Sequence, residues 1–277
     1  PDQPVGQAER ETFVPDPEQT AMLRRLAGEW GVSVNALWTA LVYLWFYKRH
    51  GQTDVVLGIP LLGRSGRLER ETIATFTNTM PVRLRIDGGE NVMEFVQAVA
   101  GQLENAYRHQ KAPYLQVLHR LRSAYPGLER LYDVCVNCYN TLPAESVGGL
   151  KAVNTEYPRK MQEYSLQIIL RSWNDTALQI DYDYRLDRYT RLQVARMHLE
   201  LMLLLEQAFK EPARAVGKLC LLTPEEFRHR VYDWNQTSVP FPEKETVLDR
   251  VIAMGECFPD RPAVQFGEGS WSHAQLL

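Results

Sequence analysis

The chain has 277 residues, with 31 Lys plus Arg against 34 Asp plus Glu and a formal net charge of −3. The charges form no long single-sign block, which argues against a nucleic-acid-binding or anionic-membrane-binding protein. Four irregularly spaced cysteines favour reduced thiols in the cytoplasm over a disulfide framework. The most apolar run, residues 34–47, would span roughly 21 Å as a helix, too short for a bilayer core of roughly 30 Å, and so predicts a core helix.

The first elements follow from helix-start residues and apolar spacing. Residues 1–15 are rich in Pro, Gln and Glu and predict an extended surface segment. Asp16 and Pro17 predict the start of a helix that stops near Gly31, because an N-cap acid followed by proline suits the first helical turn. Ser33 predicts the start of a second helix. Apolar residues occupy all faces of that helix, so we expect it to be buried nearly all round.

Strand and helix patterns mix through the rest of the first 222 residues. The run 54–60 (DVVLGIP) predicts an interior strand, 62–72 a polar loop, and 77–86 a strand with one buried face. Further expected elements are helices from Asn91, from Pro113 and over 187–210, a strand over 132–140, and paired strands 164–173 and 177–184 joined across Asn174 and Asp175. Because no strict strand–helix–strand unit repeats, we predict an α/β or α+β fold with a mixed sheet and flanking helices.

The composition changes after Leu222, which predicts a domain boundary. Residues 223–244 begin with a short helix and continue as WNQTSVPFPEKE, whose prolines and turn formers indicate a linker. A helix over 245–257, a strand over 263–266 and a helix beginning at Ser272 indicate the start of another domain. We therefore divide the chain into residues 1–222, 223–244 and 245–277.

Few residues offer catalytic chemistry on their own. The sequence contains no P-loop, dinucleotide-binding, zinc-protease or nucleophile-elbow pattern. His50 and Asp54 match H-x-x-x-D, but one ends a helix and the other begins a strand, so we do not expect them to face each other. Cys135 and Cys138 form a C-x-x-C within a strand. Positions three apart in a strand face opposite sides, which favours core packing over redox or metal chemistry.

The sequence allows both a structural and a functional interpretation of two polar motifs. His109 and Gln110 stand near Pro113 and Tyr114 at a helix end, where a histidine is more often a cap or surface group than a site residue. Asn78, at a strand entrance, suits either the orientation of a substrate amide or the satisfaction of backbone groups. Both interpretations are kept.

Several segments, taken in order, resemble the condensation domains of nonribosomal peptide synthetases. Residues 73–86 (IATFTNTMPVRLRI) resemble the family motif Gly-x-Phe-Val-Asn-Thr followed by a hydrophobic pair and Arg. Ala74 and Thr77 stand where the family usually has Gly and Val. The motif positions that the chain keeps are Phe76, Asn78, Thr79, Pro81 and Arg83.

Other segments extend the resemblance over nearly the whole chain. Residues 51–64 are similar to the family's strand and glycine-arginine turn, here Gly63 and Arg64. HQKAPY, residues 109–114, resembles His-Gln-x-x-Pro-Phe, and residues 132–140 resemble a strand that ends in Tyr-Asn, here Tyr139 and Asn140. Residues 219–226, the WNQT segment and residues 259–276 resemble the passage into an adenylation domain.

The resemblance implies one chloramphenicol-acetyltransferase-like lobe of a pair that forms a V around a tunnel. In this family the acceptor amine attacks the donor thioester, each group being carried on the phosphopantetheine arm of a carrier protein, and an amide forms. The family's signature His-His-x-x-x-Asp-Gly does not occur in this sequence. We therefore expect no catalytic residue in this chain and no activity from it alone.

The resemblance also implies roles for particular residues. Residues 1–222 would form the second wall of the tunnel, 60–81 a loop beneath it, and 157–164 a crossing to the other lobe. Tunnel-lining or supporting positions are Gly63, Arg64, Phe76, Asn78, Thr79, Pro81, Arg83, Tyr139 and Asn140, and motif positions of open role are His109, Gln110, Pro113 and Tyr114. Residues 245–277 would be the N-terminal fragment of an adenylation domain, too short to bind ATP.

The implied partners are the upstream and downstream carrier proteins, the N-terminal lobe and the adenylation domain, with no nucleic acid or membrane. Phosphopantetheine is expected only on the carrier proteins, and the chain itself is expected to bind no cofactor and no metal. Two alternatives stay open. One is a docking platform without chemistry of its own, and the other is an epimerising, cyclising or ester-forming variant of the same fold.

Overall fold

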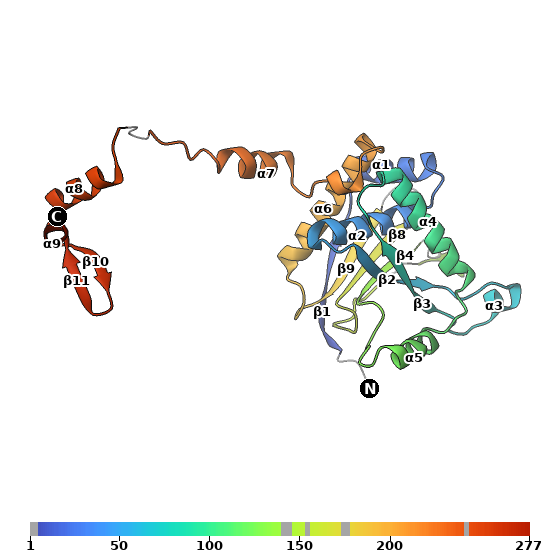
Figure 1. Cartoon of the computed structure of the whole chain (residues 1–277). Coiled ribbons are helices and arrows are strands. Elements are labelled where there is room, and N and C mark those ends of the chain that lie inside the picture. Colours follow the sequence, from blue (N-terminus) through green and yellow to red (C-terminus); the bar gives the residue numbers. More distant parts are fainter. Residues whose placement is uncertain (1–4, 140–145, 153–155, 173–177, 241–243) are drawn as a thin grey trace. The chain divides into compact units, whose positions relative to one another are not determined.

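The computed structural model describes residues 5–139, 146–152, 156–172, 178–240 and 244–277. The chain divides into two compact units, residues 1–224 and 225–277, each of which is described by itself. Figure 1 shows the helices and strands of both units.

A seven-stranded sheet forms the centre of the first unit, in the order β3-β2-β4-β8-β9-β1-β7. The neighbours β2, β4 and β8 run parallel, and the remaining neighbours pair antiparallel, which makes the sheet mixed as predicted. The strands are β1 (Gly6–Phe13), β2 (Asp54–Leu61), β3 (Asn78–Arg85), β4 (Val134–Tyr139), β7 (Met161–Gln162), β8 (Leu166–Ser172) and β9 (Leu178–Arg185). A separate two-stranded hairpin joins β5 (Ser146–Val147) and β6 (Leu150–Lys151).

Helices begin at the capping residues that the sequence predicts. The Asp16 carboxylate accepts a hydrogen bond from the Gln19 N–H at the start of α1, and the Ser33 hydroxyl accepts one from the Ala36 N–H at the start of α2. Gly51, at φ +66°, ends α2. The helices of this unit are α1 (Pro17–Glu29), α2 (Val34–His50), α3 (Arg67–Glu71), α4 (Val92–Arg108), α5 (Tyr114–Ala124) and α6 (Arg191–Lys210), followed at the boundary by α7 (Pro224–Arg228).

The main apolar core lies between one face of the sheet and the helices α1, α2, α4 and α6 (Figure 1). Alternate residues of β2, from Val55 to Leu61, point into it, as do Leu166, Ile168 and Leu170 of β8. Helix α2 is buried from Ala36 to Phe46, which confirms the prediction from its all-round apolar pattern. The other residues of these strands must face the opposite side of the sheet, because side chains alternate along a strand.

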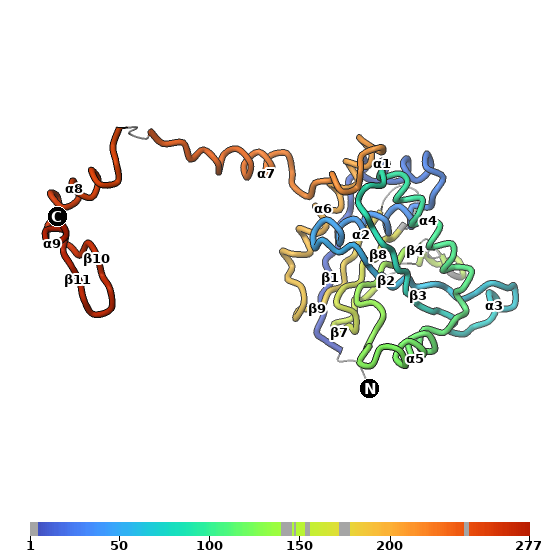
Figure 2. The backbone as a smooth tube through the Cα atoms, in the orientation of Figure 1, coloured from blue at the N-terminus to red at the C-terminus, as the bar shows by residue number. Residues whose placement is uncertain are grey.

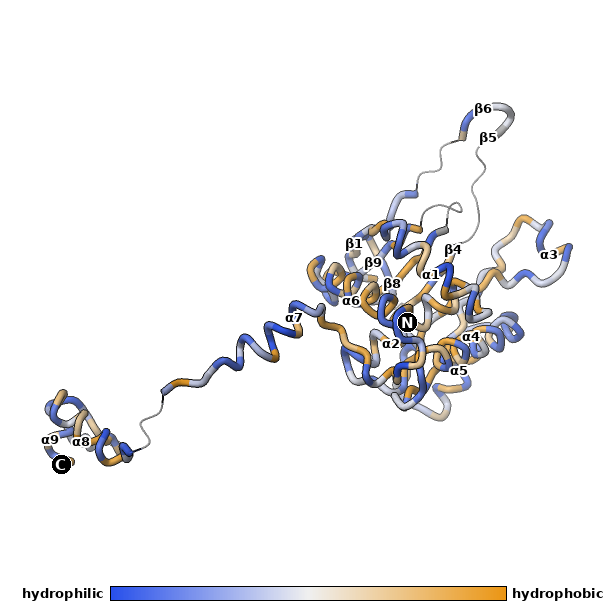
Figure 3. The backbone as a smooth tube through the Cα atoms, turned by 90° about the horizontal axis from the view of Figure 1, so that it is seen from above, coloured by the Kyte–Doolittle hydropathy of each residue, from blue (hydrophilic) through white to orange (hydrophobic). Residues whose placement is uncertain are grey.

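Two segments differ from the sequence-based expectation. Residues 6–13 are not a simple surface segment but the strand β1, which lies between β9 and β7 in the sheet (Figure 2). The expected loop 62–72 contains the helix α3, which has five residues, four of them charged. Blue stretches of the tube at α3 mark these hydrophilic residues in Figure 3. The Glu69 carboxylate stabilises the start of α3 by accepting hydrogen bonds from the N–H groups of Ser65 and Gly66.

The second unit holds α8 (Val247–Cys257), the hairpin of β10 (Pro262–Phe266) and β11 (Gly269–Ser272), and α9 (His273–Leu276). These elements match the helix, strand and helix start expected for residues 245–277. Apolar side chains of this unit remain exposed, among them Val247, Leu248, Phe266 and Trp271. Such exposure indicates a unit that does not fill a core of its own.

Candidate functional site

The motif residues Gly63, Arg64 and Phe76 meet just beyond the end of β2. A Cβ atom at Gly63 would lie 2.0 Å from the Phe76 carbonyl oxygen, and the φ of +66° also favours glycine. The Arg64 guanidinium donates hydrogen bonds to the carbonyl oxygens of Thr72, at 2.8 Å, and Ala74, at 2.5 Å. It also lies 4.5 Å from the centre of the Phe76 ring. Arg64 therefore fixes the backbone of the segment that carries α3.

Asn78 joins the start of β3 to the segment that follows α4. Its side-chain amide donates hydrogen bonds to the carbonyl oxygens of Gln110, at 3.0 Å, and Ala112, at 2.7 Å. The Gln110 side chain in turn accepts a hydrogen bond from the Gly63 N–H at 3.1 Å. Three motifs that are far apart in the sequence thus form one cluster, which we call the motif cluster: Gly63, Arg64, Phe76, Asn78 and Gln110.

Other motif residues support helix ends and a cluster of tyrosine rings. His109 is the C-cap of α4, and its Nδ1 lies 2.9 Å from the Asn105 carbonyl oxygen. Pro113 is the N-cap residue of α5. The Tyr114 hydroxyl accepts a hydrogen bond from the Leu131 N–H, and its ring lies 5.3 Å from that of Tyr132.

Tyr132 in turn packs over β2. A Cβ atom at Gly58 would lie 2.4 Å from the Tyr132 ring, so this position has no room for a side chain. Pro81 pairs with Gly58 across the β2–β3 ladder, and Thr79 pairs with Pro60. Thr79 and Pro81 therefore lie in β3, opposite the part of β2 on which Tyr132 packs.

Arg83 lies apart from the motif cluster. Its guanidinium makes two hydrogen bonds with the Asp54 carboxylate, at 2.7 and 2.5 Å, in an exposed position. Asp54 begins β2, whereas the motif cluster follows the end of the same strand. Arg83 lowers the pKa of Asp54 through these hydrogen bonds. The ion pair links the two neighbouring strands β2 and β3.

A pocket of about 630 Å³ opens beside the motif cluster, where the parallel strands β2, β4 and β8 end; we call it the strand-end pocket. Arg64 and Gln110 of the motif cluster line it, together with Thr77. Carboxyl ends of parallel strands are a common place for ligand binding in open sheets. Further lining residues come from four elements: Ile59, Leu61, Val136, Cys138, Tyr139 and Leu170 from the strands, and Val34 and Asn35 from the start of α2.

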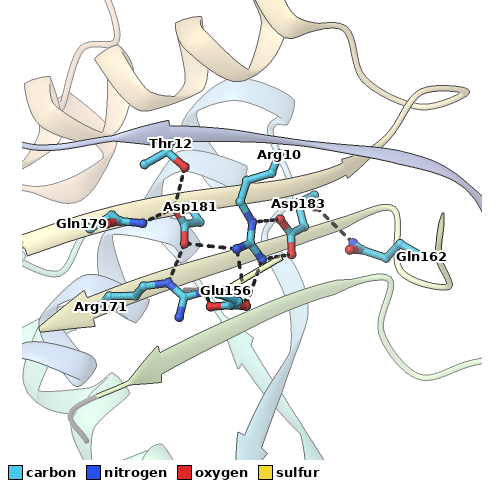
Figure 4. Close-up of polar contacts among 8 residues, drawn as sticks. All are labelled: Arg10, Thr12, Glu156, Gln162, Arg171, Gln179, Asp181 and Asp183. Carbon is cyan, nitrogen blue, oxygen red and sulfur yellow. Dashed lines mark hydrogen bonds and ion pairs between the residues drawn. The ribbon is translucent and has the colours of Figure 1, made fainter. Parts of the chain in front are cut away.

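The sheet face that lies opposite the main core carries buried charges, shown in Figure 4. Asp181 is completely buried and accepts hydrogen bonds from Arg171 Nε, at 2.5 Å, from Thr12 at 2.7 Å and from Gln179 at 2.8 Å. Burial opposes ionisation of Asp181, but these hydrogen bonds hold its pKa below the ordinary value. We call the set Arg10, Thr12, Glu156, Arg171, Gln179, Asp181 and Asp183 the sheet-face network.

The sheet-face network connects β1 and the segment before β7 to the hairpin β8–β9. Arg10 donates two hydrogen bonds to Asp183, at 2.5 and 2.7 Å, while Arg171 forms an ion pair with Glu156. The Arg171 guanidinium also lies 5.0 Å from the centre of the Tyr139 ring. Sequence reasoning did not find this network.

The segment 157–164, expected to cross to another lobe, contacts its own unit in the described structure. Met161 and Gln162 form β7 and pair with β1 at the edge of the sheet. The Gln162 amide also donates a hydrogen bond to the Asp183 carbonyl oxygen at 3.1 Å. Tyr139 ends β4 and is partly exposed, and Asn140 lies outside the described residues, as do Asn174 and Asp175.

The residues of the two weak catalytic patterns make other contacts in the structure. His50 packs against the rings of Trp45 and Phe46, whereas Asp54 is bound by Arg83. Cys135 is buried, and burial raises the pKa of its thiol to about 12. The pKa of the Cys138 thiol is raised for the same reason. Both cysteines therefore stay protonated near neutral pH.

Within the described part of the chain, no group of three or more His, Cys, Asp or Glu side chains is arranged to hold a metal ion. Among the same residues, no helix is both long and apolar enough to cross a bilayer.

A family model for the Condensation domain matches residues 2–229. Solved structures agree with this fold: the first condensation domain of the CDA synthetase has a TM-score of 0.68 at 22% identity, covering 78% of this chain and 48% of that one. A four-domain nonribosomal peptide synthetase bound to AMP and glycine has a TM-score of 0.74 at 16% identity, covering 98% of this chain and 22% of that one. The chain therefore belongs to the condensation domain family of nonribosomal peptide synthetases.

Curated relatives are peptide synthetases of much greater length. Surfactin synthase subunit 1 of Bacillus subtilis is 27% identical over 88% of this chain, which corresponds to 7% of that protein. Bacitracin synthase 1 of Bacillus licheniformis is 28% identical over 92% of this chain and 5% of its own length. The chain thus spans less than a tenth of the length of these relatives.

Proposed function

We propose that this chain supplies one lobe of a condensation domain that joins two carrier-bound aminoacyl or peptidyl groups through an amide bond. The family match over residues 2–229 carries the proposal. In this reaction the acceptor amine attacks the donor thioester carbonyl, the carbon–sulfur bond breaks, and the free thiol remains on the donor's phosphopantetheine arm. Much of the rate would come from holding both tethered reactants together, since effective molarities of about 10⁵ to 10⁸ M are reached in well-oriented intramolecular reactions.

The motif cluster and the strand-end pocket would form part of the tunnel wall. Arg64, Asn78 and Gln110 bind backbone groups, so their part would be to hold the loop of residues 60–81 in shape beside the pocket. Tyr139 lines the same pocket and would face the substrate path. The group that handles the proton of the attacking amine would belong to the His-His-x-x-x-Asp-Gly lobe, because that motif is absent from these 277 residues.

Residues 245–277 would begin an adenylation domain, with 223–244 as the linker before it. The four-domain synthetase whose structure aligns with 98% of this chain supports this assignment. The exposed apolar side chains of α8 and the β10–β11 hairpin agree with it, because the rest of such a domain would cover them. Carrier proteins, the other lobe and the adenylation domain are then the partners, and cytoplasm the expected location.

The test uses the intact synthetase that contains this chain and two carrier proteins loaded with different aminoacyl groups. Mass spectrometry of the carrier-bound products should show a dipeptidyl thioester on the acceptor carrier. If the carrier-bound product is instead epimerised, cyclised or ester-linked, the chain would belong to the corresponding variant of the fold and not to an amide-forming domain. Loaded carriers that bind but give no product would instead favour a docking platform.

A further inference from the structure

We propose that Arg171 is a positioning residue for amide formation, because it holds the ring of Tyr139 at a place that two pockets of the first unit share. The inference rests on the proposed function, in which Tyr139 faces the substrate path. It gives the sheet-face network a part in the reaction besides its part in stability. Arg171 would act only through Tyr139 and would not itself touch the reacting groups.

Tyr139 borders two pockets. It lines the strand-end pocket, and it also lines a second pocket of about 800 Å³, which we call the sheet-face pocket. Arg10, Glu156 and Asp183 of the sheet-face network line this second pocket. Among the described residues, Tyr139 is the one that lines both pockets. The direction of its ring therefore determines how the two spaces are divided.

Arg171 is placed to hold this ring. Tyr139 ends β4 and pairs with Arg171 across the parallel β4–β8 ladder, so both side chains leave the same face of the sheet. The Arg171 guanidinium lies 5.0 Å from the centre of the Tyr139 ring. Such a contact is stronger where water is excluded, and Arg171 is 3% exposed whereas Tyr139 is 42% exposed. A partly exposed ring is thus held from one side by a buried cation.

Two carboxylates fix Arg171 in turn (Figure 4). Its Nε donates a hydrogen bond to Asp181 at 2.5 Å, and its guanidinium forms an ion pair with Glu156. Asp181 is held by a further hydrogen bond from Thr12 of β1. The position of the Tyr139 ring therefore depends on contacts made by β1, β8 and β9.

This contact requires an aromatic ring at position 139 and not the phenol hydroxyl, because the cation interacts with the face of the ring. Phenylalanine would keep the ring in place, whereas leucine would lose the contact. If Arg171 acts by holding the ring, loss of the cation and loss of the ring should have the same effect, and loss of both should have no greater effect. Two independent contributions to folding would add instead.

Arg171 is removed together with Asp181, because Asp181 alone would stay buried without this partner. Arg171→Leu combined with Asp181→Leu is called the buried-pair variant. Arg25 offers a matched control: it forms an ion pair with Glu29 at 2.7 Å, and its guanidinium lies 5.2 Å from the centre of the Phe209 ring. Arg25→Leu combined with Glu29→Leu therefore removes the same two types of contact between α1 and α6.

The experiment measures kcat/KM of the intact synthetase for two carriers loaded with aminoacyl groups. Tyr139→Leu should lower kcat/KM about tenfold, the scale of a cation–π contact shielded from water, and Tyr139→Phe should hardly change it. The buried-pair variant should show a loss of similar size, and adding Tyr139→Leu to it should cause no further loss. The control with Arg25→Leu and Glu29→Leu should keep the kcat/KM of the parent.

Arg171→Lys covers the case in which the buried-pair variant does not show native circular dichroism. Lysine keeps a positive charge opposite Asp181, but it lacks the planar guanidinium that can bind a carboxylate and lie against a ring at the same time. We expect this variant to lose kcat/KM as well, and Tyr139→Leu should not increase the loss.

Three results would overturn the positioning role while leaving the reaction in place. One is a combined loss of about 100-fold, the product expected if the ring and the buried pair act independently. Another is a Tyr139→Phe variant as slow as Tyr139→Leu, and the third is a Tyr139→Leu variant as fast as the parent. Absence of amide product from every loaded pair with the parent synthetase would instead contradict the proposed function, and this inference with it.

Discussion

Replacing Asp181 by asparagine is expected to lower the free energy of unfolding of the chain by about 3 to 5 kcal/mol, the usual cost of removing one partner of a buried ion pair. Asp181 is completely buried, and Arg171, which is 3% exposed, donates a hydrogen bond to it at 2.5 Å. Asparagine has nearly the same shape as aspartate and can still accept a hydrogen bond from Thr12. It carries no negative charge, however, so the Arg171 guanidinium loses this carboxylate partner. Urea denaturation followed by circular dichroism measures the change.

An exposed ion pair provides the control. Asp54→Asn removes the partner of Arg83, but both side chains are accessible to water, so the denaturation midpoint should hardly move.

Arg171→Leu combined with Asp181→Leu should recover much of the stability that Asp181→Asn loses, because no unpaired charge then remains buried. An Asp181→Asn variant as stable as the parent would show that the sheet-face network does not hold β8 and β9 as described.

Acidification from pH 7 to pH 4.5 is expected to destabilise the first unit through His198. Burial lowers the pKa of this side chain to about 4, and its ring stacks on Phe13 with the ring centres 4.1 Å apart. In the unfolded chain its pKa is about 6.5, so between these values the unfolded state binds more protons. Stability is therefore fully present above about pH 6.5 and falls as the pH drops towards 4, by up to about 3 kcal/mol.

The comparison of parent and His198→Phe isolates this effect from the carboxylates that titrate at lower pH. Phenylalanine keeps the contact with Phe13, although it gives up the hydrogen bond with the Tyr182 hydroxyl. Between pH 4.5 and 7.5 the variant should show a flatter dependence of unfolding free energy on pH. Replacement of the exposed His119 by glutamine should leave the slope of the parent unchanged. Equal slopes for parent and His198→Phe would contradict the assignment.

Short-range sequence signals predicted those helices that are stabilised by interactions between neighbouring residues. The caps at Asp16 and Ser33 and the all-round apolar pattern of α2 were sufficient because they act within a few residues. The strand β1 was missed because its sequence, GQAERETF, is polar and lacks a clear apolar alternation. It is held by ladder pairing with β9 and by the ion pair of Arg10 with Asp183, which is 173 residues away in the sequence.

In the candidate site, too, the sequence predicts some features and only the structure shows others. Resemblance picked out Gly63, Arg64, Asn78 and Gln110. Only the structure shows that Gln110 binds both Gly63 and Asn78, whereas Arg64 binds backbone carbonyl oxygens of its own loop. The sheet-face network lay beyond sequence reasoning because its partners come from distant strands. One signal was present: Gln179, Asp181 and Asp183 occupy alternate positions of β9, which places these polar side chains on a single face of the sheet.

The central claim is that these residues form one wall of a two-lobed reaction site whose proton-handling group lies in the other lobe. The most direct measurement mixes two loaded carrier proteins with residues 1–277 alone or with the intact synthetase, and follows amide formation by mass spectrometry. We expect a dipeptidyl thioester from the intact synthetase and only background hydrolysis from the chain alone. Amide formation by residues 1–277 above the rate without protein would contradict the claim.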